Sequence, residues 1–503
     1  MTAHRYLCLD FGLTATKAVV FDAAGVEIAS ALGDTPVVAE GEASTVDMEA
    51  AWALAARLVR EVLSRSEDAG PSPLAGVGVS GHGGGLYPVD VEGRPVGPAS
   101  TSMDARARSL VESWAAEGRS AYALTHHHPW AGQLLPQARL LRDRARDHYD
   151  RTRWALGAKD WLVLRLTGVA SADRTDASNN GLVDLATGAY APAIYERFGV
   201  PELPAKLARV QESAAVVGRV SARAAAETGL IEGTPVVAGM VDVVACAVGS
   251  GALDARSASL IAGTWNINSA FDHRLVNAPA SVKTSFGPDA GRFAYVESSA
   301  TSAGNLAWLL AWAEELVGAP PGGRAALYDR LNAGVARVAP GASGLAYLPF
   351  IHRAHLAPGV DAAFLGMRAE HGAFHLARAV YEGVAFAHRA HLELLEAGGL
   401  RRERAVLSGG AAHSPVWCQI FADVLGRPVE TCDAAQAGAR GIAMAIAVGI
   451  GLRASYAEAA AAMVRPGRCY APDPIRAATY LQYYARFREA AARLGGPAPP
   501  LRL

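Results

Sequence analysis

The feature that most constrains the fold of this chain is a strand–turn–strand pattern that occurs once in each half of the sequence. Residues 6–22 and residues 258–272 each contain two short apolar runs on either side of a turn, and in both halves the second run ends in aspartate. Short apolar runs bounded by Gly, Asp or other polar residues are typical of β-strands. We therefore expect each half to begin with a β-hairpin. The turns carry Gly12 and Thr14 in the first half and Gly263 and Thr264 in the second.

The length and charge of the chain limit the kinds of protein it can be. With 503 residues it can form two or three domains, each with its own buried core. Its 47 Lys and Arg residues balance 48 Asp and Glu residues, so it has no overall field for nucleic acid or an anionic membrane. We expect neither as a partner. No low-complexity linker separates the halves, and we expect domains at residues 1–250 and 251–503, packed as lobes around a ligand-binding cleft.

The cysteines and the most hydrophobic stretch favour a cytoplasmic protein. The 5 cysteines are scattered and form no CxxC pair, which fits a reducing cytosol better than a disulfide or zinc framework. Residues 235–253 are the most membrane-like run, but Asp242 interrupts them. A carboxylate at the centre of a bilayer would cost roughly 3 kcal/mol. We therefore expect a buried strand followed by a helix in this stretch.

Three further segments have helical patterns that bear on the site. Residues 137–149 predict a charged helix, and residues 415–425 predict a helix that begins at Pro415 with Ser414 as its N-cap. Residues 437–451 are rich in Ala and Gly, which suits a helix packed closely against backbone.

Two motifs that resemble known nucleotide or hydrolase signatures do not have the context those sites need. Residues 76–81 match GxGxxG, but three glycines follow where a dinucleotide site needs a helix, so we expect a strand. Residues 82–85 resemble the oxyanion loop of esterases, but no GxSxG accompanies them. A Walker P-loop is also absent, so any nucleotide must be held in another way.

The first hairpin carries a set of groups that suits phosphate binding. Gly12 lets backbone N–H groups approach an anion, Thr14 and Thr16 can donate to phosphate oxygens, and Asp10 can hold water on a magnesium ion, with Lys17 as a nearby cation. A solvated β-turn is the simpler interpretation of this segment alone. The second hairpin favours the phosphate interpretation, because two lobes that each offer one such turn can hold a nucleotide across a cleft.

Further short motifs occur in a fixed order along the chain. Together with the two hairpins they are residues 10–17, 79–83 with Asp104 and Arg106, Lys159 with Asp160, 166–168, 239–242, Gly263 with Thr264, 408–411 and 438–441. In this order and spacing the motifs resemble the FGGY carbohydrate kinase family, in the superfamily of actin, hexokinase and the chaperone ATPases. The resemblance extends over roughly residues 5–450, and it implies an α/β protein with the two-lobed actin-like ATPase (ribonuclease H-like) fold and an inter-lobe cleft. It also implies ATP and Mg²⁺ as cofactors.

The same resemblance assigns expected roles. Asp10, Gly12, Thr14, Thr16 and Lys17 belong to the first phosphate hairpin. The second phosphate hairpin is Gly263 and Thr264, and the loop against the adenosine is Gly409, Gly410 and Ala411. The sugar site is lined by His82, Gly83, Asp104 and Arg106. Residues 81–87 and 262–266 are most similar to the branch that phosphorylates L-xylulose, 3-keto-L-gulonate or erythritol.

Asp242 is the candidate general base, because a carboxylate within hydrogen-bond reach can take the proton of a sugar hydroxyl as it attacks the γ-phosphorus. It is also a candidate sugar and metal contact, together with Asp10 for the metal. On spacing alone, Asp242 could be an ordinary helix N-cap. His82 could equally be a core histidine, and Asp104 and Arg106 could pair in a surface turn, where the pair would contribute about 1 kcal/mol or less.

The sequence therefore predicts an ATP-dependent carbohydrate kinase that transfers the γ-phosphate to a primary hydroxyl of a ketopentose or a related polyol. A superfamily ATPase of chaperone or filament type and a catalytically silent sugar sensor are the alternatives. The expected partner is a small sugar or polyol, and a homodimer is one open possibility for the assembly.

Overall fold

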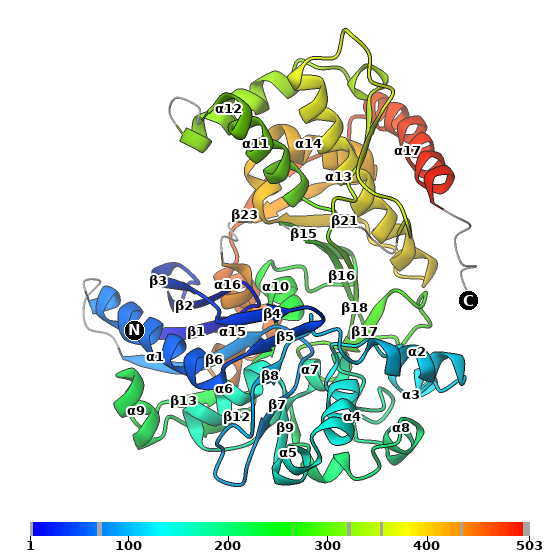
Figure 1. Cartoon of the computed structure of the whole chain (residues 1–503). Coiled ribbons are helices and arrows are strands. Elements are labelled where there is room, and N and C mark those ends of the chain that lie inside the picture. The colour runs from blue at the N-terminus through cyan, green and yellow to red at the C-terminus, as the bar shows by residue number, and fades with distance from the viewer. Residues whose placement is uncertain are drawn as a thin grey trace.

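The computed structural model describes residues 4–67, 73–263, 265–318, 323–352, 356–432 and 436–495. Thr264 lies outside these ranges. The chain forms two lobes, one coloured mainly from blue to green and the other from green to red (Figure 1). Each lobe is built on a seven-stranded sheet with helices packed around it. The α/β class and the two-lobed arrangement predicted from the sequence are confirmed.

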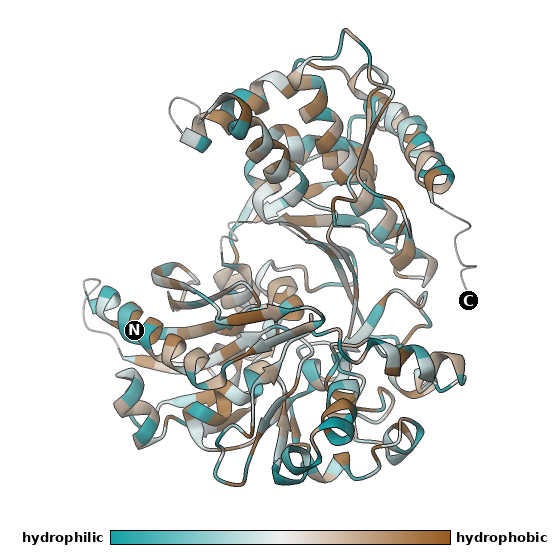
Figure 2. Ribbon diagram, in the orientation of Figure 1, coloured by the Kyte–Doolittle hydropathy of each residue, from teal (hydrophilic) through white to brown (hydrophobic). Residues whose placement is uncertain are grey.

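The N-terminal sheet begins with the predicted hairpin. Strands β1 (Arg5–Phe11), β2 (Ala15–Asp22) and β3 (Glu27–Asp34) form an antiparallel meander. Strand β6 (Leu74–Gly81) lies parallel to β1 on its other side. Strands β13 (Pro235–Val237) and β14 (Met240–Val241) both pair with β6, and β12 (Val216–Arg219) pairs with β13. The GxGxxG match is thus a strand, as expected. Figure 2 shows hydrophobic strands inside this lobe and hydrophilic residues on outer helices such as α9 (Ala222–Thr228).

The C-terminal sheet begins with the second predicted hairpin. Strands β15 (Ser257–Ala262) and β16 (Asn266–Asp272) pair antiparallel, and β18 (Phe293–Ser299) and β17 (Lys283–Phe286) continue beyond β16. On the other side, β21 (Arg404–Ser408) lies parallel to β15, followed by β22 (Val429–Cys432) and β23 (Pro466–Tyr470). Both lobes therefore place a hairpin beside a parallel strand, with the hairpin turn at the carboxyl end of that parallel strand.

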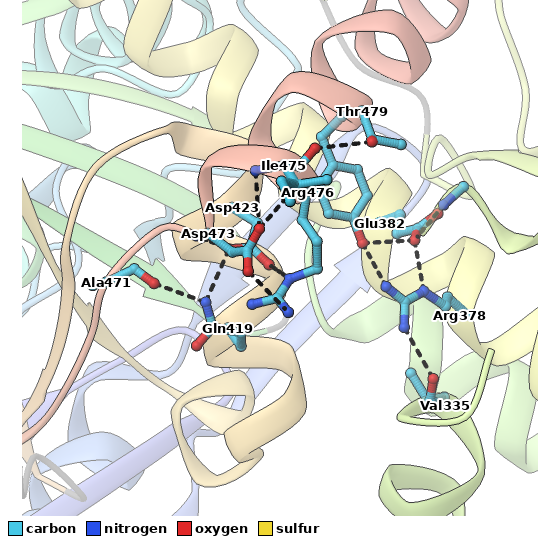
Figure 3. Close-up of polar contacts among 12 residues, drawn as sticks. Val335, Arg378, Glu382, Gln419, Asp423, Ala471, Asp473, Ile475, Arg476 and Thr479 are labelled. Atoms are coloured by element: carbon cyan, nitrogen blue, oxygen red, sulfur yellow. Dashed lines mark hydrogen bonds and ion pairs between the residues drawn. The ribbon is translucent and has the colours of Figure 1, made fainter. Parts of the chain in front are cut away.

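Helices of the C-terminal lobe are joined by buried polar contacts (Figure 3). Within α13 (Ala373–Ala397), Arg378 Nε donates to Glu382 Oε1 over 2.8 Å, and the Tyr480 hydroxyl of α17 (Pro474–Leu494) donates to the same oxygen. Helix α14 (Pro415–Leu425) begins as predicted, with Ser414 accepting from the Trp417 amide.

Two helices that are neighbours in space but not in sequence pack together on the N-terminal sheet. Helix α10 (Asp242–Gly249) follows β14, and α15 (Ala437–Gly449) packs against it and against β1 and β6 of the N-terminal lobe. Helix α16 (Tyr456–Met463) also lies on the N-terminal lobe (Figure 1). A β-carbon on Gly441 would lie 2.1 Å from the Ala245 carbonyl oxygen, and one on Gly249 would lie 1.8 Å from that of Ala437. The expected close packing of this Ala/Gly-rich helix is confirmed.

The remaining elements complete the two lobes. The predicted single helix at residues 137–149 is wrong, because the backbone leaves the helical region at Ala145 and divides it into two helices, α4 and α5. No helix within the described ranges has the length and apolar character needed to cross a bilayer. The remaining elements are β4 (Val37–Glu40), β5 (Ala43–Val46), α1 (Met48–Glu67), β7 (Tyr87–Val89), β8 (Ala99–Ser100), α2 (Arg108–Ala116), α3 (Tyr122–Thr125), α4 (Leu134–Arg144), α5 (Arg146–Arg151), β9 (Trp154–Leu156), α6 (Ala158–Thr167), β10 (Ala172–Asp173), α7 (Arg174–Asn179), α8 (Pro192–Arg197), η1 (Leu203–Lys206), β11 (Val210–Gln211), α11 (Gly304–Val317), α12 (Gly323–Val335), η2 (Ala342–Gly344), β19 (Ala346–Leu348), β20 (Ala363–Leu365) and η3 (Gly410–His413).

Candidate active site

Asp242 is the first residue of α10, at the point where β14 ends. Its Oδ1 accepts a 2.7 Å hydrogen bond from the Val243 amide. The N-cap position belongs to Val241, which makes no side-chain cap, so the interpretation of Asp242 as an ordinary N-cap is wrong. The carboxylate is therefore available for another role.

The surroundings of Asp242 bring the pKa of its carboxyl group close to neutral pH. The pKa of Asp242 is raised to about 7, first by burial and then by the negative charge of Asp10. The Val243 amide and the Lys283 ammonium act in the opposite direction, because they stabilise the charged form. A carboxylate with this pKa can both take and release a proton under physiological conditions.

Asp10 lies at the end of β1, opposite Lys17 in the hairpin. The Ser80 hydroxyl donates to Asp10 Oδ1 over 2.8 Å. The start of α15 is also close, since a β-carbon on Gly438 would lie 3.6 Å from Asp10 Oδ2. The structure thus brings Asp10 near enough to Asp242 for their charges to interact, as the sequence hypothesis requires.

The first hairpin turn is a tight one. The Gly12 amide donates to the Ala15 carbonyl, and a β-carbon on Gly12 would lie 2.9 Å from that oxygen. Thr14 is exposed at the turn, whereas Thr16 is fully buried and its hydroxyl pairs with that of Thr35. Thr35 in turn donates to the Gly12 carbonyl, so Thr16 stabilises the turn through Thr35. The expectation that the Thr16 hydroxyl contacts phosphate is therefore corrected.

Lys17 lies in the N-terminal lobe and the second hairpin in the C-terminal lobe. Lys17 lines an open cavity of about 390 Å³ with residues of β3, α1 and Gln436. In the C-terminal lobe, Gly409 has φ of +85°, and a β-carbon there would lie 3.0 Å from the Gly263 nitrogen. The predicted phosphate turn and adenosine loop are therefore neighbours. Gly410 follows in η3, and Ala411 is buried, so only its backbone can contribute to a ligand site.

The predicted sugar-site residues near β6 divide into two groups. A β-carbon on Gly83 would lie 2.3 Å from Asn179 Nδ2 and 2.9 Å from the Val241 side chain, which places this turn next to Asp242. His82 is instead buried, with its Nε2 3.0 Å from the Tyr87 hydroxyl. Burial lowers the pKa of His82 to about 4. His82 is therefore buried in the core as the alternative predicted, but its Nδ1 has no hydrogen-bond partner among the described residues, so the expected sugar contact stays a prediction.

Asp104 and Arg106 form a pair, but a buried one rather than a surface turn. Asp104 is almost fully buried and accepts from Arg106 Nη2 over 2.6 Å and from the Ser44 amide over 3.2 Å. Gln137 Nε2 donates to the Asp104 carbonyl oxygen. With its carboxylate so occupied, Asp104 is placed to hold Arg106, whose side chain is the more exposed of the two.

The Lys-Asp motif at Lys159 supports the turn before Asp242. Lys159 Nζ lies 2.5 Å from Asp160 Oδ1 and 3.2 Å from Asp173 Oδ1, and all three side chains are buried. Asp173 accepts from the Thr175 hydroxyl, which in turn accepts from the Val241 amide. This chain of contacts fixes the backbone immediately before the candidate base.

Two functional candidates were missed by sequence reasoning. Lys283 of β17 places its Nζ 4.1 Å from the centre of the Trp130 ring, and Asn179 lies against Gly83. The four-residue strand of Lys283 carries no motif that could have identified it. Within the described ranges, no group of three or more His, Cys, Asp or Glu side chains is arranged to hold a metal ion.

Comparison with protein-family models decides the family. The N-terminal domain of the FGGY family of carbohydrate kinases matches residues 5–249, and its C-terminal domain matches residues 258–450. The chain belongs to the FGGY carbohydrate kinases. It is therefore an ATP-dependent sugar kinase whose substrates include ATP and a small sugar, and the alternative of a chaperone or filament ATPase is wrong.

Individual relatives of this FGGY kinase agree with that assignment. The chain is 32% identical over 502 residues to an L-xylulose/3-keto-L-gulonate kinase of Escherichia coli (strain K12), covering 98% of this chain and 97% of the relative. It is 30% identical over 502 residues to an erythritol kinase of Brucella abortus (strain 2308), covering 96% and 95%. A xylulose kinase from Rhodospirillum rubrum has a similar structure, with a TM-score of 0.86 at 27% identity, covering 97% of this chain and 99% of that one. The actin-like ATPase fold expected from the sequence is confirmed.

Proposed function

We propose that this FGGY kinase transfers the γ-phosphate of ATP to a primary hydroxyl of a ketopentose or a related polyol. The observation that carries the proposal is the placement of Asp242, a carboxylate with a pKa of about 7, beside Asp10 and the Gly83 turn. The printed names of two relatives, an L-xylulose/3-keto-L-gulonate kinase and an erythritol kinase, give the substrate class.

In this proposal Asp242 acts as the general base. Its carboxylate takes the proton of the sugar hydroxyl as that oxygen attacks the γ-phosphorus, and the bond between the γ-phosphorus and the β,γ-bridging oxygen breaks. ADP leaves with the electron pair of that bond. The Val243 amide donates to Asp242 Oδ1, so it orients the carboxylate and leaves Oδ2 for the substrate.

The nucleotide is proposed to lie between the two hairpin turns. Backbone amides near Gly12 and Gly263 would contact the phosphates, and the Gly409–Gly410 turn beside Gly263 would face the adenosine. Positive φ at Gly409 brings its backbone within contact of β15, where a side chain would collide. This way of binding the nucleotide does not require a Walker P-loop, which the sequence lacks.

Asp10 and Asp242 are the residues proposed to hold Mg²⁺. Their charges interact, and each would be stabilised by a cation between them. Magnesium commonly binds to one or two carboxylates and completes its shell with water and substrate phosphates, so two acids suffice. When bound, the ion would neutralise charge on the β- and γ-phosphates.

A coupled assay of ADP release tests the proposal. ATP and Mg²⁺ are held constant while pentuloses, hexuloses, tetritols, pentitols and glycerol are offered in turn. We expect turnover that depends on the acceptor, with a pentulose or a related polyol among the best. Turnover at the same rate without any acceptor would contradict the proposal. A protein that binds sugar but gives no turnover with any acceptor would instead be the sugar sensor.

A further inference from the structure

The second hairpin turn has open space around it, so its position depends on the residues on either side. A β-carbon on Gly263 would meet no atom of the described residues within 4 Å beyond its chain neighbours, and Trp265 is exposed. On one side of the turn, β15 ends at Ala262, and a β-carbon on Gly409 would lie 2.8 Å from the Ala262 carbonyl carbon. On the other side, β16 begins at Asn266, which is buried. The contacts of Asn266 therefore bear directly on where this turn lies.

Asn266 belongs to a network of buried polar side chains. Its Nδ2 donates to the Thr301 hydroxyl over 3.2 Å, and its Oδ1 accepts from Asn268 Nδ2 over 2.7 Å. Asn268 also contacts two histidines of α13, because its Nδ2 is 2.9 Å from His391 Nδ1 and its Oδ1 is 2.9 Å from His388 Nδ1. All five residues are 0% exposed. Asn268 is the centre of the network, since the contacts from Asn266 and from both histidines meet at its amide.

The amide of Asn268 sets the tautomer of each histidine. Because Asn268 Nδ2 donates to His391 Nδ1, that nitrogen carries no proton, and His391 Nε2 donates to the Ser299 hydroxyl over 2.9 Å. His388 has the opposite tautomer, so its Nδ1 donates to Asn268 Oδ1 and its Nε2 accepts from the Ser302 hydroxyl over 3.1 Å. Burial lowers the pKa of His388 to about 3, which keeps this ring neutral. Every ring nitrogen thus has a partner, and the network carries no charge.

The other ends of the network lie in the segment between β18 and α11. Ser299 is the last residue of β18, and its hydroxyl is 2.8 Å from that of Thr301. The Ser302 carbonyl accepts from Asn305 Nδ2, in the first turn of α11, over 3.0 Å. The network therefore ties the start of β16 to α13 and to the segment that leads into α11.

The first hairpin has a smaller support of the same kind. Thr16, in the strand after the first turn, pairs with Thr35, whose hydroxyl donates to the Gly12 carbonyl. In both lobes, buried polar side chains hold the strand that leaves the predicted phosphate turn. Such groups cost free energy when a partner is lost, so they hold one arrangement more strictly than apolar packing does. One fixed arrangement suits a turn whose amides must point at phosphate oxygens.

We propose that Asn268 is a positioning residue for the nucleotide. Through Asn266 it holds the start of β16, and with it the second hairpin turn, in the orientation that binds the phosphates. Asn268 is fully buried and acts only through its neighbours. The inference rests on the proposed function for the place of the nucleotide between the two turns. It goes further in stating that loss of the network weakens nucleotide binding and leaves acceptor binding unchanged.

The test compares two variants of Asn268 with a control that contacts the same helix. Asn268→Leu keeps the size of the side chain but has no polar group. Asn268→Asp keeps an acceptor for both histidines, since His391 can carry its proton on Nδ1 instead, and it loses the donation to Asn266. The control is Tyr480→Phe, which removes a buried hydroxyl that donates to Glu382 of α13 and whose partners among the described residues lie outside the second hairpin.

Calorimetry measures the binding of ADP with Mg²⁺ and, separately, of the best acceptor, and steady-state kinetics and thermal unfolding are recorded for each variant. We expect Asn268→Leu to weaken ADP binding and to lower kcat/KM for ATP by about 10- to 100-fold, the range for one lost hydrogen bond to a charged group. Acceptor binding without nucleotide should change by less than about threefold. Asn268→Asp should recover part of the loss. Tyr480→Phe should lower Tm and bind ADP as the unmodified enzyme does.

Three results would overturn the inference. A folded Asn268→Leu variant with lower Tm but unchanged ADP affinity would mean that the network only stabilises the lobe. Equal losses for ADP and for the acceptor would mean that it shapes the whole cleft and not the turn. If Asn268→Leu does not fold, unchanged ADP affinity in Asn268→Asp would have the same force. ADP binding by the unmodified enzyme without turnover on any acceptor would instead refute the proposed function, and the comparison of ADP affinities would still decide the role of Asn268.

Discussion

The crossing of α10 and α15 provides a prediction whose size can be worked out from the structure. At Gly441, a β-carbon would lie 2.1 Å from the Ala245 carbonyl oxygen and 2.9 Å from its carbon. Both are backbone atoms, so no rotamer change can relieve the contact. To reach an ordinary separation of about 3.2 Å, the two helices must move apart by about 1 Å in the Gly441→Ala variant.

Two terms set the cost of that movement. Overpacking a close-packed interface costs about 1–3 kcal/mol, sometimes more. Replacing glycine with alanine inside a helix returns about 1 kcal/mol. Because the overlap is with backbone, we expect the upper part of the range and a net loss of about 2 kcal/mol. Since α10 begins with Asp242, the shift also moves the candidate base, and a displacement of about 1 Å can lower kcat about 100-fold.

The assay is a comparison of thermal unfolding and steady-state kinetics for Gly441→Ala and a control, Gly97→Ala. A β-carbon on Gly97 would meet only the His148 ring, at 3.4 Å, so this variant should resemble the unmodified enzyme. We expect Gly441→Ala to lower Tm by several degrees and kcat by about two orders of magnitude. A Tm within one degree of the control and a kcat within about twofold would refute the packing argument.

Three further predictions concern charge. Asp242 must be ionised to accept a proton and its pKa is about 7, so kcat/KM measured with both substrates below saturation should fall as pH drops below about 7. Lys283→Met removes a positive charge that stabilises the carboxylate, so it should move this acidic fall in kcat/KM to higher pH. A flat profile between pH 5 and 8 would contradict the assignment. Arg378→Met leaves the Glu382 carboxylate buried without its cation and should cost about 3–5 kcal/mol in urea unfolding, with Arg378→Met/Glu382→Gln less destabilised than the single variant. Chelation of Mg²⁺ should abolish turnover and added Mg²⁺ should restore it, and undiminished turnover in chelator would refute the role given to Asp10 and Asp242.

The sequence could predict the elements and the family because those depend on local patterns. The two hairpins have apolar runs of strand length with a glycine turn, and α14 begins with a Ser-Pro start signal, so both were predicted. The helix at residues 137–149 was not, because its charged pattern continues through Ala145, where the backbone changes direction.

The contacts within the site depend on packing that local patterns do not encode. The burial of Thr16 and His82 and their contacts with Thr35 and Tyr87 follow from tertiary packing, which the local sequence pattern does not show. The position of Lys283 in the site is still harder to predict from the sequence. Its charge interacts with that of Asp242 because β17 docks onto α7, two segments that are more than 100 residues apart in the chain.

The central claim is that Asp242 is the proton acceptor, and the most direct measurement is the turnover of Asp242→Asn under conditions where the unmodified enzyme is saturated. The amide has nearly the same shape and cannot take the proton, so we expect kcat to fall by about 10²- to 10⁴-fold while Tm stays the same or rises and the acceptor still binds. A folded Asp242→Asn enzyme that phosphorylates its acceptor at a near-normal rate would contradict the account.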